Sequence, residues 1–394
     1  MQNNKMTIIN FNFLNKALLF IFTFTLAFER AFPFLPGLSF PKAAAILYLA
    51  SLILNPSYMR VLLEIKANKL IFMLLSIWFL LNVFNGGLLK YGIEELDIPF
   101  FLNIALVWIL LNHERLDPGI LEKALIYFSL GYFCLVIIYY LGFYQTLSNG
   151  RVLIGKALPN ALGMSGVFAI CGALKLLRMR FNYSFFVKPL ICIGAIMIIS
   201  LILATGSRSS LLALVFVVGI FFFWSSIKVK LGLITVGIIL IPLALPFFSV
   251  IIERSASTVE NVEFGGRLMY WLFMLEVISQ NIILGVGQGG YNFLTDLQFG
   301  HSPSPHNVFV EVFILGGLTA FILWLWLLKV VLSQGLYSIR YEKNITKLML
   351  APPILLVGVS GQIFNNSLIF YIFALIFSTT MIYTKQSRAM HSKI

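Results

Sequence analysis

Charged residues are scarce in this sequence. Asp, Glu, Lys and Arg make up 11% of the 394 residues, whereas a soluble domain carries about 25%. Hydrophobic residues make up 60%, so a folded chain of this composition cannot cover its surface with polar groups. The composition excludes a soluble enzyme, a secreted disulfide scaffold and a disordered chain. It predicts an integral membrane protein.

Cysteines and metal-binding motifs are also few. Cys134, Cys171 and Cys192 lie in apolar runs without pairing or metal-ligand spacing, so we interpret them as buried thiols. The sequence has neither Asp-x-Asp nor His-Glu-x-x-His, and no acidic cluster dense enough for a divalent ion. We therefore expect neither a metal ion nor another cofactor.

Long apolar runs recur along the whole chain. A spanning helix needs about 20 such residues, and the runs are continuous, which favours helices over a barrel of alternating strands. The sequence predicts an all-α integral membrane protein, a single polytopic domain over residues 1–394 with about twelve transmembrane helices. The expected spans are 11–28, 40–55, 70–86, 98–112, 124–143, 159–177, 189–204, 209–225, 231–251, 307–328, 347–364 and 366–384.

The formal net charge of +13 is best interpreted as a topology signal. With the N-terminus inside, most Lys and Arg residues fall in cytoplasmic segments and most acidic residues fall outside, loop after loop. This pattern predicts that both termini are cytoplasmic. It also accounts for the positive net charge, so we expect no nucleic-acid partner. Membrane lipid is the expected environment.

One outer segment, residues 252–306, is much longer than the other loops. It lies between the ninth and tenth expected helices and contains the apolar stretch RLMYWLFMLEVISQN. Its aromatic and aliphatic content argues against disorder, and we expect a partly helical cap on the outer membrane surface. The glycines in GVGQGG more plausibly permit a tight turn than a nucleotide loop, because no strand precedes them.

Two outer segments before this cap carry unusual polar residues. Arg208 lies in a very short turn between two expected spans, and arginine at membrane depth is a functional hypothesis by default. Arg151 and Lys156 lie in the outer loop that leads to Asn160 at a helix entrance. Because arginine binds pyrophosphate through paired hydrogen bonds, these residues are candidates for a lipid-linked pyrophosphate.

Further candidates lie within and just after the cap. Arg267 follows two glycines and precedes Trp271 by four residues. His306 ends the long loop, and histidine is suited to proton transfer near neutral pH. Asn307 and Glu311 are four apart, so they share a helix face beside it. We interpret the remaining outer histidine as an ordinary loop residue.

A transferase site on this outer face requires a donor that brings its own leaving group across the bilayer, because ATP and nucleotide sugars are not supplied there. A sugar linked to a polyprenyl pyrophosphate meets that requirement. Arginines can stabilise the departing pyrophosphate in place of a metal, and a base can deprotonate an acceptor hydroxyl.

Several short motifs occur in order along this outer face. Pro-Asn-Ala-Leu-Gly follows Arg151, Arg-x3-Leu begins at Arg208, and Gly-Arg with a later Trp includes Arg267. His306 and Gly317 form His-x10-Gly. Arg-x3-Leu alone has little value, but the set resembles the bacterial O-antigen ligase and polymerase superfamily.

The resemblance implies a GT-C-like fold with a catalytic core over residues 150–325, and a metal-independent, inverting glycosyltransferase of the bacterial inner membrane. It implies transfer of O-antigen glycan from undecaprenyl pyrophosphate to a sugar hydroxyl of lipid A–core, in an active site facing the periplasm. By matching position, His306 is the expected base, and Arg208 and Arg267 are expected to hold the pyrophosphate.

Three alternatives remain open from the sequence. An O-antigen polymerase shares this domain and extends glycan on a second lipid carrier, and Arg254 followed by ten residues and Gly265 is similar to a polymerase-type pattern. A lipid-linked glycan transporter or flippase also suits twelve helices, but its polar groups usually lie at mid-membrane. A non-catalytic scaffold gives no reason for outer arginines around one histidine.

Overall fold

A computed structural model describes the protein over residues 2–29, 31–35, 38–55, 69–83, 97–147, 150–179, 187–235, 237–238, 263–301, 307–342, 344–360 and 366–378. These residues are mostly helical. The helices that precede the predicted cap are α1 (Gln2–Leu26), α2 (Phe40–Ile53), α4 (Lys69–Asn82), α6 (Ile98–Leu116), α7 (Ile120–Tyr140), α8 (Pro159–Arg178), α9 (Val187–Ala204) and α10 (Arg208–Phe223). The later helices are α12 (Glu263–Ser279), α13 (Gly287–Phe299), α14 (Val308–Glu342), α15 (Thr346–Ser360) and α16 (Ser367–Phe377).

Helix is found in each expected span. Most of the span 231–251 lies outside the described residues, and its described residues, 231–235 and 237–238, are helical. Among the described helices, α7, α8, α9 and α14 are long and apolar enough to cross a membrane. Shorter apolar helical segments are Asn12–Leu26 within α1, α2, α4, α10, Thr346–Val357 within α15, and α16. The all-helical membrane class is therefore confirmed, whereas the number of spans and their orientation stay predictions.

Two short antiparallel hairpins are the exceptions to the helical architecture. β1 (Pro33–Leu35) pairs with β2 (Leu38–Ser39), and β3 (Gln145–Thr146) pairs with β4 (Val152–Leu153). Each hairpin lies in a connection between helices, where the expected fold has only a loop. The second hairpin matters for function because Arg151 directly precedes β4.

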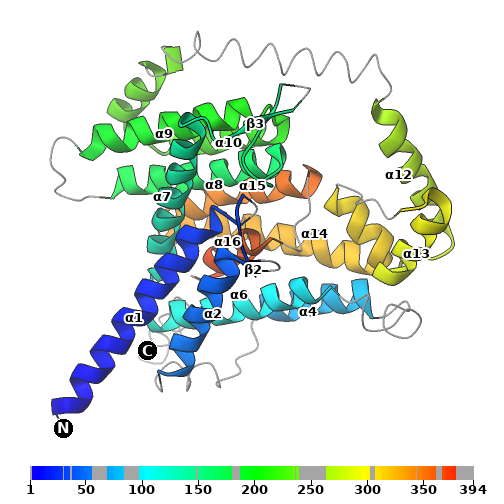
Figure 1. Cartoon of the computed structure of the whole chain (residues 1–394), viewed down its shortest axis with the longest axis horizontal. Helices are drawn as coiled ribbons and strands as arrows, with labels where there is room; N and C mark the ends of the chain where they lie inside the picture. The colour runs from blue at the N-terminus through cyan, green and yellow to red at the C-terminus, as the bar shows by residue number, and fades with distance from the viewer. Residues whose placement is uncertain are drawn as a thin grey trace.

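The bundle helices α8, α9 and α10 lie side by side, and α15 packs against both α8 and α10 (Figure 1). α16 lies in the middle of the molecule, and every residue from Leu368 to Phe377 is buried. The side chain of Tyr371 donates a hydrogen bond to the carbonyl oxygen of Leu121 at 2.6 Å. This hydrogen bond connects the central helix α16 to α7.

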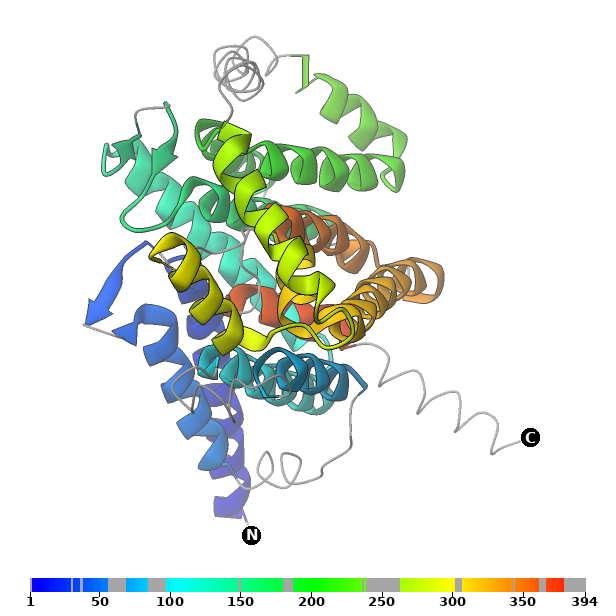
Figure 2. The ribbon, with the colours of Figure 1, turned by 90° about the vertical axis from the view of Figure 1, so that its right-hand side faces the viewer.

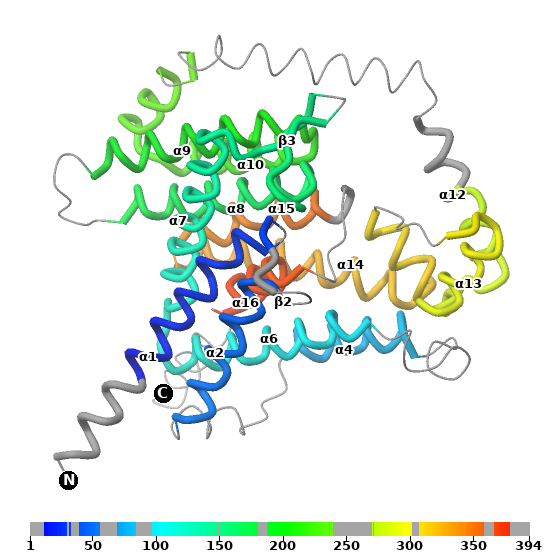
Figure 3. The backbone as a smooth tube through the Cα atoms, viewed as in Figure 1, coloured from blue at the N-terminus to red at the C-terminus, as the bar shows by residue number. Residues whose placement is uncertain are grey.

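The expected cap is partly helical, as predicted. α12 and α13 form a corner that lies at the right-hand edge in Figure 3 and faces the viewer in Figure 2. Both helices pack against α14. The backbone N–H of Val286 donates to the carbonyl oxygen of Ile314 at 3.0 Å, and that of Leu318 donates to Ile282 at 2.8 Å. These bonds fix the corner to the first part of α14.

Glycines make this attachment possible. α14 is kinked at Gly317, where φ is +62°, and Gly285 in the corner has φ of +69°. A Cβ built on Gly317 would lie 2.5 Å from the backbone nitrogen of Gly285, and one on Gly285 would lie 2.5 Å from the nitrogen of Gly317. Of the GVGQGG stretch, Gly285 closes a turn by donating its N–H to the carbonyl oxygen of Asn281 at 2.8 Å, whereas the residues from Gly287 onward begin α13. The partner of Gly285 is the glycine of the His-x10-Gly pattern.

Candidate functional site

The turn between α9 and α10 presents Arg208 as the first residue of α10. α9 ends at Ala204, so only three residues connect the two helices. Ser207 is the N-cap: its side-chain oxygen accepts from the backbone N–H of Ser210 at 3.4 Å and from the Ser210 hydroxyl at 2.8 Å. Such capping satisfies backbone groups at the helix start. The Arg208 side chain is exposed beside this capped turn.

Arg151 reaches from the β3–β4 hairpin to the same turn. Its Nε donates to the carbonyl oxygen of Thr205 at 2.9 Å, and a terminal nitrogen donates to Oδ1 of Asn160. A cation at the C-terminal end of α9 is also favoured by the helix dipole. The structure therefore brings together Arg151, Asn160 and the turn that leads to Arg208. This proximity is necessary if the three residues belong to one site.

A glycine lets α8 approach this turn closely. A Cβ on Gly163 would lie 2.7 Å from the hydroxyl oxygens of both Thr205 and Ser210. Thr205 in turn donates to the carbonyl oxygen of Ile202 at 2.6 Å. The polar side chains of the turn are thus packed against α8, and Arg208 projects from a rigid support.

Lys156 is in the same outer loop but in a different environment. Its side chain is exposed, while its backbone N–H donates to the carbonyl oxygen of Ala31 at 3.2 Å. Gly155, with φ of +57°, allows that approach. Lys156 therefore belongs to the rim of the site and does not share in the contacts of Arg151.

A second polar group surrounds the start of α14. The side-chain oxygen of Asn307 accepts from the backbone N–H of Phe309 at 3.0 Å, so Asn307 caps this helix. One carboxylate oxygen of Glu311 is buried and has no hydrogen-bond partner among the described residues. Asp97, the N-cap of α6, is near enough for its charge to act on Glu311.

Tyr291 of α13 is buried in the vicinity of this group. Burial raises the pKa of Tyr291, and the negative charge of Glu311 raises it further. Burial likewise raises the pKa of Asp97, against the hydrogen bond from the backbone N–H of Phe100. Asp97 at the start of α6, Tyr291 of α13 and Glu311 of α14 therefore lie near enough for their charges to interact, and groups of these types can form hydrogen bonds with hydroxyls.

Other predicted site residues are described only in part. His306 lies outside the described residues, and Arg267 and Trp271 belong to α12 but their side chains are not described. On the same helix, the hydroxyl of Tyr270 hydrogen-bonds Nε2 of His301 at 3.0 Å. The placement of the predicted base and the second pyrophosphate arginine stays a prediction.

Sequence reasoning missed Asp97 and Tyr291. Asp97 did carry a signal, because Asp before Ile-Pro is typical of a helix N-cap with proline in the first turn. Nothing near Tyr291 in the sequence indicates that it faces Glu311. Its position depends on how α13 packs against α14 and α4.

The protein is thus an all-helical membrane protein with two groups of candidate site residues. One lies around Arg151 and Arg208, the other around Glu311, and both are at the ends of helices. A model of the family described as O-antigen ligase matches residues 192–325. The resemblance to the O-antigen ligase superfamily is thus confirmed over this segment, and the chain is similar to membrane glycosyltransferases of the ligase and polymerase type. No curated protein matches the chain.

The matched segment contains Arg208, Arg267 and His306, the three predicted catalytic residues. It ends after Gly317 and begins after the loop with Arg151 and Asn160. The catalytic core that the sequence predicts begins at residue 150, whereas the segment matched by the family model begins at residue 192. The hydrogen bonds from Arg151 to Thr205 and Asn160 join that earlier loop to the matched segment.

Proposed function

We propose that this protein is an O-antigen ligase. It moves a glycan from undecaprenyl pyrophosphate to a sugar hydroxyl of lipid A–core, on the periplasmic face of the bacterial inner membrane. The family match over residues 192–325 carries this proposal, because it contains all three predicted catalytic residues. The donor and the acceptor are both lipids, which suits a site at the ends of membrane helices.

The proposed reaction forms a bond between the acceptor oxygen and the anomeric carbon and breaks the bond from that carbon to the pyrophosphate oxygen. His306 takes the proton of the acceptor hydroxyl as general base. Attack from the face opposite the leaving group inverts the anomeric centre, and undecaprenyl pyrophosphate leaves with the electron pair.

Arg208 and Arg267 hold the pyrophosphate as its charge grows. A guanidinium binds two phosphate oxygens at once, and donors fixed before the reaction stabilise a developing charge without reorganising. The capped turn and the packing of α8 support such a fixed position for Arg208. Arg151, Lys156, Asn160 and Trp271 complete the binding surface for the donor in this proposal.

Asn307 and Glu311 lie on the acceptor side of the proposed site. One carboxylate oxygen of Glu311 is buried without a hydrogen-bond partner among the described residues, so in this proposal a sugar hydroxyl that enters the site supplies the missing bond. Glu311 follows His306 by five residues. A buried acceptor that binds a ligand hydroxyl gives specificity, because an analogue without that hydroxyl leaves the group unsatisfied.

The decisive experiment offers the purified protein an undecaprenyl pyrophosphate-linked glycan together with either lipid A–core or a second lipid-linked glycan. We expect a lipid A–core product that carries the glycan. A ladder of longer glycans on the lipid carrier would instead identify a polymerase. Movement of the donor across a vesicle membrane, without any new glycosidic bond, would identify a flippase and contradict the proposal.

A further inference from the structure

An open pocket lies between the last turn of α8 and the first turn of α15. α8 has 20 residues and is therefore about 30 Å long. Asn160, at the proposed donor site, lies in its first turn, so the pocket lies near the opposite membrane surface. Lys175, Arg178, Asn344 and Thr346 form its polar lining.

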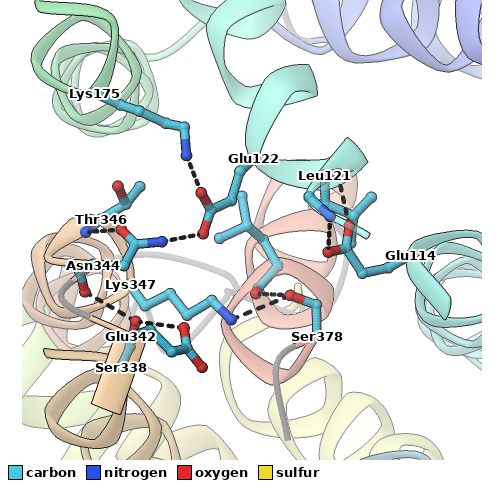
Figure 4. A network of polar contacts seen from close by, with 12 residues as sticks. Glu114, Leu121, Glu122, Lys175, Ser338, Glu342, Asn344, Thr346, Lys347 and Ser378 are labelled. Carbon is cyan, nitrogen blue, oxygen red and sulfur yellow. Dashed lines mark hydrogen bonds and ion pairs between the residues drawn. The ribbon is translucent and has the colours of Figure 1, made fainter. Parts of the chain in front are cut away.

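The polar wall of the pocket is fixed by a network that Figure 4 shows. Lys175 forms an ion pair with Glu122, and the two side chains are 12% and 16% exposed. The other carboxylate oxygen of Glu122 accepts from the amide nitrogen of Asn344. The side-chain oxygen of Asn344 accepts from the backbone N–H of Thr346 at 3.0 Å, which caps α15. Three helices thus hold these groups in place before any ligand binds.

The pocket is lined by two cations, Lys175 and Arg178, and the carboxylate of Glu122 neutralises only one of them. Lys175 uses one of its three N–H donors on Glu122. Arg178 is exposed and makes no hydrogen bond or ion pair with any described residue, although it lines the same pocket. The pocket therefore has a net positive lining with unused donors. A phosphate group satisfies such donors, and arginine can bind two of its oxygens.

The rest of the lining is apolar. Leu174, Ile345 and Met349 form its buried part, and Met179, at the C-cap of α8, is partly exposed. A pocket that combines cations with apolar side chains at a membrane surface suits an amphiphile. We infer that it binds the phosphodiester of an anionic phospholipid in the leaflet opposite the proposed transfer site. Met179, the partly exposed apolar residue of the lining, then contacts the glycerol and the first methylenes of the acyl chains.

Native mass spectrometry of the full-length detergent-solubilised protein tests this inference. Phosphatidylglycerol and phosphatidylcholine with the same acyl chains are titrated separately, and the occupancy of the tightest bound lipid is compared. We expect phosphatidylglycerol to bind more tightly, and Arg178→Gln to weaken its binding about tenfold, because one charge-assisted contact is lost. Arg178→Lys keeps the charge and should retain most of the binding.

Lys188→Gln is the matched control. Lys188 is an exposed cation in the first turn of α9 and does not line the pocket. Equal losses for the two Gln variants, or equal affinity for the two lipids, would overturn the inference. Displacement of phosphatidylglycerol by millimolar inorganic phosphate would mean that the pocket is an ion site and not a lipid site. None of these readouts uses glycan transfer, so the result is independent of the proposed function.

Discussion

Arg151 donates a hydrogen bond from Nε to the carbonyl oxygen of Thr205 at 2.9 Å, across 54 residues of sequence. Its second bond, to Asn160, joins the first turn of α8 to the same guanidinium. Thr205 lies three residues before Arg208. Arg151 therefore positions the turn from which Arg208 projects, whether or not it also contacts the donor.

Replacing Arg151 with Lys should lower glycan transfer about tenfold or more. Lysine keeps the charge but cannot bond both partners through a planar fork, and each charge-assisted hydrogen bond contributes about 1.5–3 kcal/mol. The measurement is kcat/KM for the lipid-linked donor. Lys42→Gln, which removes an exposed cation at the start of α2, is the control and should leave kcat/KM unchanged. Wild-type activity in Arg151→Lys would show that the bonds to Thr205 and Asn160 are dispensable.

Arg208→Lys should reduce transfer more than it reduces donor binding. The bidentate contact strengthens as the pyrophosphate leaves, so its loss appears mainly in kcat, by roughly 10- to 100-fold. Single-turnover assays and donor-binding assays on the same variant separate the two quantities. Equal losses in binding and in kcat/KM, with kcat preserved, would assign Arg208 to ground-state binding only.

His306→Ala should abolish transfer while the protein still inserts and purifies normally, because the acceptor hydroxyl loses its base. His301→Ala is the matched variant five residues earlier. The substitution removes two exposed hydrogen bonds of His301, to the hydroxyl of Tyr270 and to the carbonyl oxygen of Phe299. Each contributes about 1 kcal/mol, so most activity should remain. Retained transfer in His306→Ala would remove His306 as the base.

The membrane class, most helix positions and the helical cap could be predicted from the sequence, because apolar periodicity and length are local properties. The sequence also places Arg208 at a short turn between two apolar helices, as the structure has it, whereas the role of Arg208 stays a prediction. The helix α14 was underestimated: it was expected over 307–328 but continues to Glu342. Its later polar residues face a network with Asn344, which a hydropathy scan does not detect.

Contacts between distant segments were beyond the sequence. The hydrogen bond between Arg151 and Thr205 depends on a β hairpin whose two strands have only two residues each. The proximity of Asp97 and Tyr291 to Glu311 requires three helices to pack in one arrangement. Such arrangements follow from the whole core, and a single sequence does not specify which helix ends meet.

Chelation gives a test that does not require a variant. The proposed reaction stabilises pyrophosphate with arginines, so transfer by the purified protein should be unchanged after treatment with EDTA and gel filtration. Activity is measured with and without added Mg²⁺ or Mn²⁺. Loss of transfer on chelation, with recovery when one of these ions returns, would contradict the metal-independent mechanism.

The contact between Gly317 and Gly285 predicts a loss of stability for Gly317→Ala. The new methyl group would lie 2.5 Å from backbone atoms of Gly285 and Ile283, and φ of +62° disfavours alanine. A non-glycine residue in such a backbone region costs about 1–3 kcal/mol even before the steric overlap is counted. Thermal unfolding in detergent should therefore show a lower midpoint than the wild type.

Gly219→Ala is the control for this substitution. Gly219 lies inside α10, and a Cβ there meets nothing within 4 Å, so alanine should leave stability unchanged or raise it by about 0.5–1 kcal/mol. Because Gly317 attaches the α12–α13 corner to α14, Gly317→Ala should also make the corner more susceptible to limited proteolysis. Wild-type protease resistance together with a wild-type unfolding midpoint would show that the corner does not depend on this glycine pair.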